Sequence, residues 1–432
     1  MTTPILDFVR RYADSGTLRL HMPGHKGVPT LGCEGLDITE VAGADSLYAP
    51  TGVIRESEAN VTALFGSRAT FYSTEGSSQC IRAMLALALR ERKPKRILAG
   101  RNAHRSFLSA CALCGAEPDW LWPEAGEGLL SCTVRPETLA RALDEAATGY
   151  AAVYVTSPDY LGRLADVSAL AAVCHERGLP LLVDNAHGAC LRFLPGARHP
   201  LEQGADLVCD SAHKTLPVLT GGAYLHIADP RFVPGAKQML ALFGSTSPSY
   251  LILASLDACN ARLAGDYPML LAEAARDTAD LRRTLQALGW ETVDADPLRI
   301  TLRCDGTKAA ARLRTQGMEP EYAGPDALVL MLTPENAAAA RARVPAALGP
   351  CREAPPAPPP PLPRPGRVCT VREALFAPQM SCPAQAAIGR ICGAPTVACP
   401  PAVPIVTAGE RIPEQALPLF QYYGVETVDV LL

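Results

Sequence analysis

The feature that most constrains the fold is a stretch, from about residue 55 to 230, in which short apolar segments alternate with helical patterns. Apolar segments of this length that carry almost no charge are typical of parallel strands covered on both faces. We predict helices over 55–66, 78–92 and 167–178, and strands over 96–100, 151–157, 179–186, 205–212 and 221–227. Strands that alternate with helices favour an α/β fold with a mostly parallel sheet.

The rest of the chain is predicted to form an arm and smaller domains around this sheet. A helical pattern over 249–289 is interrupted near Gly265 and Pro268. The tract EAPPAPPPPLPR is typical of an extended spacer, although such tracts also bind SH3-type modules. The predicted parts are an N-terminal arm at 1–30, a large domain at 31–285, a small α+β domain at 286–353, a Pro-rich linker at 354–366 and a C-terminal domain at 367–432.

Composition excludes several classes of protein. The 432 residues carry 40 basic and 44 acidic side chains, so there is no basic excess for binding nucleic acid or a membrane surface. No window resembles a signal peptide or a membrane span, so we expect a soluble cytoplasmic protein. The 15 cysteines are scattered. Cys111 and Cys114 have CxxC spacing without a second pair, so buried reduced thiols are favoured over a metal or redox site.

Two polar residues lie at or just past the carboxyl ends of neighbouring predicted strands, where ligands collect in open α/β sheets. Lys214 in SAHKT follows the strand 205–212, and Asp184 in DNAHG lies in the strand 179–186. A lysine with a lowered pKa forms a Schiff base readily, and a carboxylate keeps the pyridine nitrogen of a cofactor protonated. The alternatives are a lysine in a surface loop and an aspartate that caps a helix.

Two further motifs stand before helices. Gly76, Ser77 and Ser78 in TEGSSQ lie at the start of the predicted helix 78–92, and their N–H groups and hydroxyls suit a phosphate. An ordinary helix cap is the alternative. His104 in GRNAHRS follows the strand 96–100, where its ring is either stacked on a planar cofactor or part of a plain loop. The order of phosphate cradle, stacking histidine, ring-nitrogen acid and lysine is that of pyridoxal-phosphate (PLP) enzymes with the aspartate-aminotransferase fold.

Together with LHMPGHKG (20–27), STSPSYLILASLD (245–257) and CPPAVPIVTAGE (399–410), these motifs resemble the short form of the bacterial ornithine/lysine/arginine decarboxylases. The resemblance spans nearly the whole chain and is weakest over 290–365. It implies fold type I, with a seven-stranded, mostly parallel sheet in the large domain. It also implies PLP-dependent decarboxylation of a basic amino acid, a role in polyamine metabolism and a homodimer with active sites at the subunit interface. No metal is expected.

The resemblance also implies a role for each matching residue. Lys214 would carry PLP as a Schiff base, Asp184 would pair with the pyridine nitrogen, and His104 would stack on the ring. His187 and His213 complete the candidate catalytic set. The cofactor-binding residues would further include Gly76, Ser77, Ser78, Ala186, Ser211 and His213, with Ser245 and Ser247 reaching the phosphate of the partner chain. HMPGHKG and Glu410 would help to shape the substrate pocket.

Two departures from the family pattern lie beside the site. The family often has Asp-Glu-Ala-His-Gly-Ala-His where this chain carries Asn185 and Cys190, which leaves the substrate preference among arginine, lysine and ornithine open. The chain also has Glu75 before its glycine and serines, where the family often has asparagine. Another fold-type-I PLP enzyme, such as an aminotransferase or a lyase, and a non-catalytic regulatory relative are the alternative functions.

Overall fold

The computed structural model describes residues 1–90, 92–124, 127–196, 199–352, 356–395 and 402–432. Its largest sheet has seven strands in the order β1-β7-β6-β5-β4-β2-β3. They are β1 (Ala69–Ser73), β2 (Arg96–Gly100), β3 (Glu117–Leu121), β4 (Ala152–Thr156), β5 (Leu181–Asp184), β6 (Leu207–Asp210) and β7 (Ala223–Ile227). Strand β7 is antiparallel to β1 and β6, whereas the pairs β5–β6, β2–β3 and β2–β4 are parallel. The predicted α/β fold with a mostly parallel seven-stranded sheet is confirmed.

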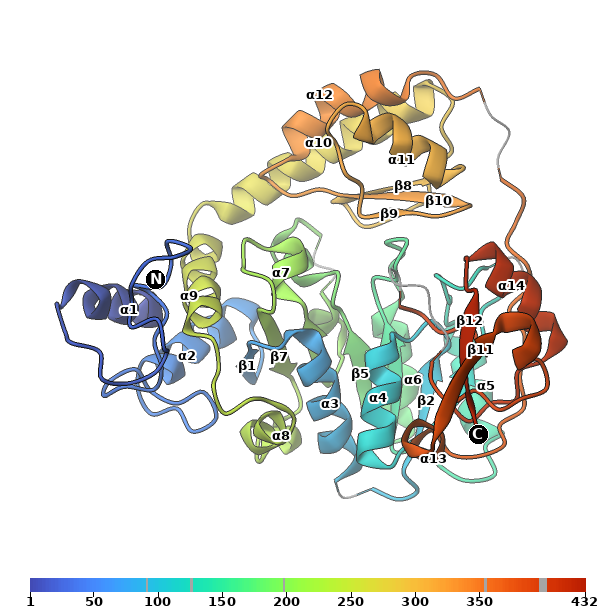
Figure 1. The fold of residues 1–432 in the computed structure, drawn as a ribbon, viewed down its shortest axis with the longest axis horizontal. Helices are drawn as coiled ribbons and strands as arrows, with labels where there is room; N and C mark the ends of the chain where they lie inside the picture. Colours follow the sequence, from blue (N-terminus) through green and yellow to red (C-terminus); the bar gives the residue numbers. More distant parts are fainter. Residues whose placement is uncertain (91, 125–126, 197–198, 353–355, 396–401) are drawn as a thin grey trace. The chain divides into compact units, whose positions relative to one another are not determined.

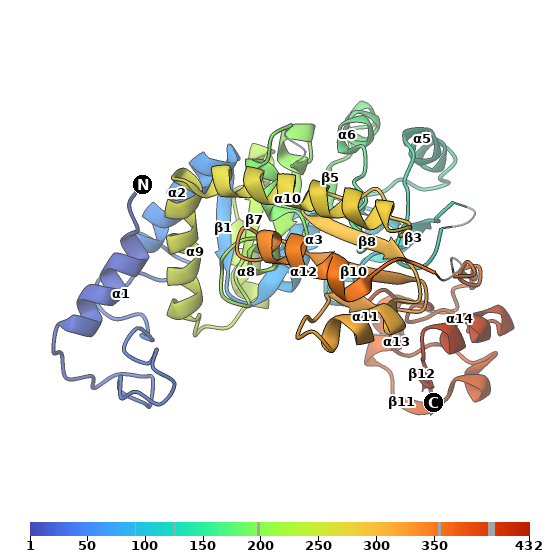
Figure 2. The same ribbon diagram turned by 90° about the horizontal axis from the view of Figure 1, so that it is seen from above.

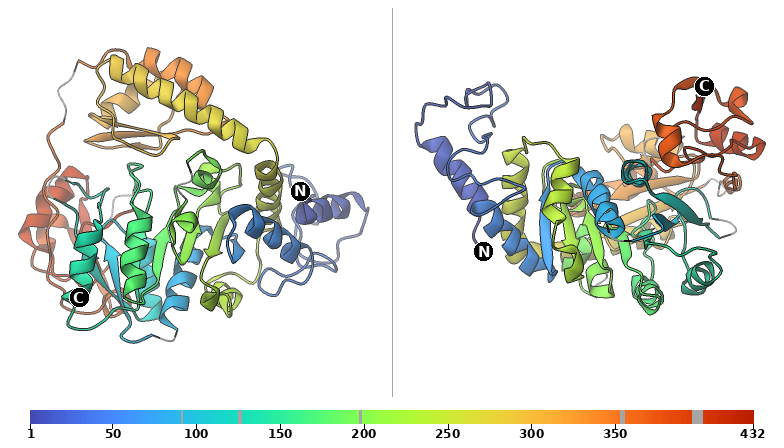
Figure 3. Two further views of the ribbon diagram at one scale, coloured as in Figure 1. Left: turned by 180° about the vertical axis from the view of Figure 1, so that it is seen from behind. Right: turned by 90° about the horizontal axis from the view of Figure 1, so that it is seen from below.

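The chain divides into two compact units, each made of two separate stretches of sequence. The first unit comprises residues 1–90 and 180–270 and holds β1, β5, β6 and β7. Its helices are α1 (Pro4–Asp14), α2 (Val53–Phe65), α3 (Gly76–Leu89), α7 (Ala212–Thr215), α8 (Ala236–Phe243) and α9 (Tyr250–Ala264). Helix α3 packs against β1, β6 and β7, and α1 lies beside α2 and α9 (Figure 1, Figure 3).

The second unit comprises residues 91–179 and 271–432 and contains β2, β3 and β4. It also holds α4 (Arg105–Cys114), α5 (Pro136–Asp144), α6 (Val167–Glu176) and most of α10 (Tyr267–Ala287). A three-stranded antiparallel sheet follows, in the order β8 (Arg299–Arg303), β10 (Ala327–Met331) and β9 (Tyr322–Ala323). Helices α10, α11 (Gly306–Arg314) and α12 (Ala337–Leu348) lie over one face of this sheet (Figure 1).

The C-terminal segment of the second unit shares an apolar cluster with the three-stranded sheet. It contains α13 (Val371–Phe376), α14 (Leu417–Tyr422) and a hairpin of β11 (Gln379–Pro383) with β12 (Thr427–Leu431). Ile405, Ile412 and Phe420 are fully buried in one apolar cluster with Val329 of β10. Described residues 356–366, in the predicted linker, adopt no helix or strand. The proposed domain boundaries stay a prediction.

Most predicted elements of the large domain are present. The five predicted strands contain β2, β4, β5, β6 and β7, and the predicted break near Gly265 separates α9 from α10. Sequence reasoning missed β1 and β3, which are the two edges of the sheet. Strand β3 has the sequence EPDWL, and only an edge strand accommodates its proline and two carboxylates.

The structure also bears on two sequence predictions, which concern membrane spans and the Cys111–Cys114 pair. Every helix within the described ranges is too short or too polar to cross a lipid bilayer. Cys111 and Cys114 lie in α4 as free cysteines. Burial raises the pKa of the Cys114 thiol to about 11, so it is protonated at neutral pH and a poor metal ligand.

A buried ion pair joins α2 to α8 in the first unit. Lys237 Nζ lies 2.5 Å from Glu58 Oε1, and their side chains are 16% and 6% exposed. Lys237 also donates to Leu47 O at 2.6 Å, and Glu58 accepts from the backbone N–H of Tyr72 in β1 at 3.0 Å. This pair therefore fixes two helices and an edge strand around the half of the sheet that contains β5 and β6.

We expect Lys237→Met to lower the free energy of unfolding by about 3 kcal/mol, because the Glu58 carboxylate would stay buried without its cation. Urea denaturation followed by circular dichroism measures this loss. Lys308→Met is the matched control, since Lys308 is 67% exposed in its pair with Asp305 and its removal should cost less than about 1 kcal/mol. Equal stability of the two variants would contradict the role given to the buried pair.

Candidate active site

The predicted lysine and one predicted histidine meet just beyond the carboxyl ends of β5 and β6. Lys214 lies in the single turn of α7, whose backbone is held by Lys214 N–H donating to Ser211 O at 3.0 Å. Its Nζ is 2.9 Å from Nε2 of His187, which follows β5 and is 8% exposed. The structure thus brings an amine and an imidazole from neighbouring strands into direct contact.

Asp184 is the last residue of β5 and is 2% exposed. Its Oδ1 accepts from the backbone N–H of Ala186 at 3.1 Å, and the Cys209 thiol lies 3.5 Å away. The parallel register pairs Asp184 with Cys209. Burial and the nearby carboxylate raise the pKa of Cys209 well above its usual range, so the thiol stays protonated and donates to Asp184. Cys209 was not predicted from the sequence, although its place two residues before Ser211 on β6 was a usable signal.

The predicted phosphate cradle forms at the N-terminus of α3. Gly76 begins the helix with φ of 71°, a left-handed value that favours glycine. The hydroxyl of Ser211 donates to Ser77 Oγ at 2.8 Å, so residues from α3 and from the β6–α7 connection lie together. Ser78 occupies the first turn of the helix. Hydroxyls and the positive end of a 14-residue helix provide the donors that a phosphate requires.

His213 and the loop that follows α8 flank this cradle. Nδ1 of His213 donates to the carbonyl oxygen of Gly222 at 3.0 Å, which fixes the tautomer of the ring. Burial lowers the pKa of His213 and Lys214 adds to the effect, so the ring is neutral at pH 7. Ser245 and Ser247 are exposed in the loop before α9. The backbone N–H of Ser245 donates to the Glu75 carboxylate, which ties this loop to the cradle.

His104 belongs to the second unit, so its stacking on the ring stays a prediction. It is the N-cap of α4, and its Nδ1 accepts from the backbone N–H of Ser106 at 3.1 Å. The proton of the neutral ring is therefore on Nε2. The next residue, Arg105, donates its backbone N–H to Ala402 O at 2.9 Å. The C-terminal motif is thereby anchored to the loop that carries His104.

Glu410, expected near the substrate pocket, is buried inside the second unit. Its Oε2 accepts from Thr407 N–H at 2.7 Å and lies 4.0 Å from the guanidinium of Arg101. Arg101 is 1% exposed and donates to Pro404 O at 2.7 Å and Ile405 O at 2.9 Å. These contacts give Glu410 a structural function within the C-terminal motif, and its role in the substrate pocket stays a prediction.

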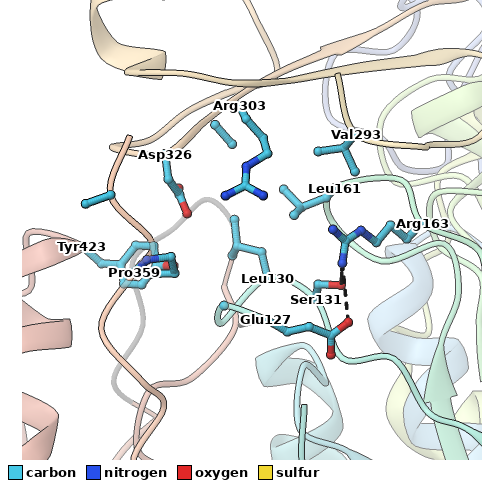
Figure 4. Close-up of a pocket in the computed structure, with 13 residues that line it drawn as sticks. Glu127, Leu130, Ser131, Leu161, Arg163, Val293, Arg303, Asp326, Pro359 and Tyr423 are labelled. Atoms are coloured by element: carbon cyan, nitrogen blue, oxygen red, sulfur yellow. Dashed lines mark hydrogen bonds and ion pairs between the residues drawn. The ribbon is translucent and has the colours of Figure 1, made fainter. Parts of the chain in front are cut away.

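A pocket in the second unit with polar and apolar walls is too small to hold a cofactor (Figure 4). Its volume is about 60 Å³, which accommodates a few water molecules, whereas ligand sites usually measure about 300–1,000 Å³. Arg163, which donates to Glu127 at 3.5 Å and to Ser131 at 3.3 Å, contributes its polar wall. None of the predicted site residues lines it.

The chain is similar to known proteins in both sequence and fold. Residues 3–301 match the family described as Orn/Lys/Arg decarboxylase, major domain. The chain belongs to the Orn/Lys/Arg decarboxylase family. It is 32% identical over 327 residues to the uncharacterized protein YaaO of Bacillus subtilis, covering 70% of this chain and 67% of that protein. It is 30% identical to an arginine decarboxylase of Bacillus cereus, covering 73% of this chain and 72% of that protein.

Solved structures support the same fold. The lysine decarboxylase LdcF of Francisella novicida superposes with a TM-score of 0.82 and 17% identity, covering all of this chain and 81% of that one. A solved structure of SPT with PLP is also similar to this chain in fold, with a TM-score of 0.57. The predictions of family, fold type and cofactor are confirmed: this member of the decarboxylase family is a PLP enzyme of fold type I.

The described residues of the first unit fit PLP by their chemistry. Ser77, Ser78 and Ser211 offer hydroxyls for the phosphate, and buried Asp184 offers a negative charge for the pyridinium nitrogen. The amine of Lys214 lies 2.9 Å from Nε2 of the His187 imidazole. The assignment of these residues to the cofactor remains a proposal, which is developed below.

Ser77→Ala is expected to weaken PLP binding about tenfold, since one hydrogen bond to a charged phosphate contributes about 1.5 kcal/mol. Absorbance titration of the apoenzyme with PLP measures this change. Ser168→Ala is a suitable control, because Ser168 is an exposed residue at the start of α6. An unchanged PLP affinity in Ser77→Ala would remove Ser77 from the phosphate site.

Proposed function

We propose that this decarboxylase holds PLP covalently on Lys214 and acts on arginine or another basic amino acid. The observation that carries the proposal is the placement of buried Asp184 at the end of β5 and of Lys214 just past the end of the adjacent parallel strand β6. An acid and a primary amine at adjacent strand ends are the two groups that PLP chemistry requires. Arginine is favoured among the substrates because relatives that are 30% identical are named arginine decarboxylases.

Bound PLP supplies an electron sink for the electron pair that is left at Cα when the carboxylate departs as CO2. In this proposal Asp184 keeps the proton on the pyridine nitrogen, because its buried negative charge favours the protonated ring. The cradle of Ser77, Ser78 and Ser211 holds the phosphate and fixes the orientation of the ring. His187 exchanges a proton with the Lys214 amine, since 2.9 Å separates their nitrogen atoms.

We further propose that the enzyme is a cytoplasmic homodimer that supplies amines to polyamine metabolism. Residues 18–31 carry Leu18, Leu20 and Leu31 with 80%, 85% and 86% of each residue exposed. In Figure 2 this stretch belongs to a loop that extends from the end of α1, away from β1 and β7. Several large apolar side chains on one exposed loop are typical of a surface that a second protein covers. Exposed Ser245 and Ser247 would then reach the site of the partner subunit.

Lys214→Ala is expected to abolish decarboxylation and the visible absorbance of lysine-bound PLP together. The assay measures CO2 and amine release from arginine, lysine and ornithine, with keto-acid formation measured in parallel to detect an aminotransferase. Lys308→Ala serves as the control because Lys308 is an exposed lysine of α11. Turnover that survives in Lys214→Ala, or keto acid without CO2 from the wild type, would overturn the proposal.

The double variant Leu20→Asp/Leu31→Asp is expected to shift the protein from dimer to monomer, because it places charge on the exposed apolar loop. Sedimentation velocity at micromolar concentration measures the shift. Leu432→Asp is the matched control, since Leu432 is also largely exposed, at 78%, but lies at the C-terminus. A wild type that sediments as a monomer would contradict the proposed dimer.

A further inference from the structure

A second polar cluster lies behind the candidate site, on the other face of the sheet. Successive side chains of a strand point to opposite faces. Asp184 and Cys209 contact each other on one face, so the next residues, Asn185 and Asp210, point to the opposite face. There Asn185 Nδ2 donates to Asp210 Oδ1 at 2.7 Å, and both residues are fully buried.

Two buried histidines also form hydrogen bonds with the Asp210 carboxylate. Nε2 of His199 lies 3.0 Å and Nε2 of His226 lies 3.1 Å from Oδ2 of Asp210. Nδ1 of His226 lies 2.8 Å from the hydroxyl of Thr70 in β1. The hydrogen bonds therefore run from Asn185, just past β5, through Asp210 of β6 and His226 of β7 to Thr70 of β1. His226 lies opposite Val208 of β6.

The electrostatics of this cluster favour an ionised Asp210. Burial opposes ionisation, but the two imidazoles offset it, and the pKa of Asp210 is lowered well below its usual range. Burial lowers the pKa of His226, which favours a neutral ring that donates from Nε2. The carboxylate thus accepts three hydrogen bonds, of the charge-assisted kind that is roughly twice as strong as a neutral one.

The same three groups could in principle bind a metal ion, because their ligand atoms lie within 4.8 Å of one another. The proton positions favour hydrogen bonds instead. Nδ1 of His199 accepts from the backbone N–H of Leu201 at 3.3 Å, so Nε2 of the neutral ring carries the proton and points it at Asp210. A ligand nitrogen would have to lose this proton.

We propose that Asp210 is a positioning residue, which holds the ends of β5 and β6 together from the far face of the sheet and so sets the spacing between Asp184 and the Lys214 turn. Asp210 is directly followed by Ser211, which contacts Ser77, and by α7 with Lys214. Asn185 directly follows Asp184. A change in the Asp210–Asn185 bond therefore displaces both sides of the cofactor site. This inference rests on the proposed binding of PLP at Lys214.

The same two strands provide a matched control at their other end. Asp206 is 8% exposed at the start of β6, and its Oδ2 accepts from Leu181 N–H at the start of β5 at 2.7 Å. Asp206→Asn and Asp210→Asn each remove one buried negative charge from the β5–β6 pair. Only Asp210→Asn does so next to the candidate site.

Asp210→Asn is expected to raise the Kd for PLP about tenfold and to lower kcat with little change in KM. Asp206→Asn is expected to lower the melting temperature of the apoenzyme by a similar amount but to leave the Kd for PLP unchanged. The exchanged pair Asn185→Asp/Asp210→Asn keeps one charge and the hydrogen bond between the two positions, so PLP affinity should return to within about threefold of the wild type. Absorbance titration of each apoenzyme and thermal denaturation give these values.

If Asp210→Asn fails to fold, His226→Gln removes one donor from the same carboxylate and should raise the Kd for PLP about threefold. Equal PLP affinity of the Asp210→Asn and Asp206→Asn proteins would overturn the positioning role while leaving the proposed function intact. A wild type that binds no PLP would overturn the proposed function itself. If the wild type contains one equivalent of metal and Asp210→Asn contains none, the cluster is a metal site and the proposed hydrogen-bonded arrangement is wrong.

Discussion

The parallel pairing of β5 with β6 is the constraint on which the candidate site depends. Each strand is only four residues long, and every residue in both is buried. The ladder that pairs Asp184 with Cys209 determines which side chains face each other where the strands end. Because both strands run in the same direction, their carboxyl ends deliver the acid at 184 and the turn with Lys214 to one edge of the sheet.

The pairing of β5 with β6 brings a different set of polar groups together on each face of the sheet. On one face the Asp184 carboxylate contacts the Cys209 thiol, and just beyond the strand ends the Lys214 amine contacts the His187 imidazole; these are the groups that we propose to face the cofactor. On the other face Asp210, Asn185 and two histidines are fully buried and bonded to one another. Neighbouring residues in the sequence thus belong to separate networks that share one backbone, so packing on the far face controls the geometry of the near one.

Sequence reasoning succeeded where a single segment determines the structure. Apolar runs located β5 and β6, and a polar residue at the end of such a run located Asp184 and Lys214. It failed where the answer depends on partners from distant segments. The contact between Cys209 and Asp184 follows from the register between β5 and β6. His226, which donates to Asp210, lies 16 residues later on the antiparallel strand β7. The edge strand β3 was missed because solvent at an edge permits the charges that the apolar pattern excludes.

The substitution at position 185 illustrates this dependence on register. The sequence suggested that replacing the usual glutamate by Asn185 bears on substrate preference. The structure instead directs Asn185 away from Asp184, with its amide donating to the Asp210 carboxylate. A glutamate at this position would bring a second negative charge against Asp210, whereas an amide satisfies the carboxylate without adding charge. The identity of residue 185 is therefore coupled to that of residue 210, and a role for Asn185 in substrate preference stays a prediction.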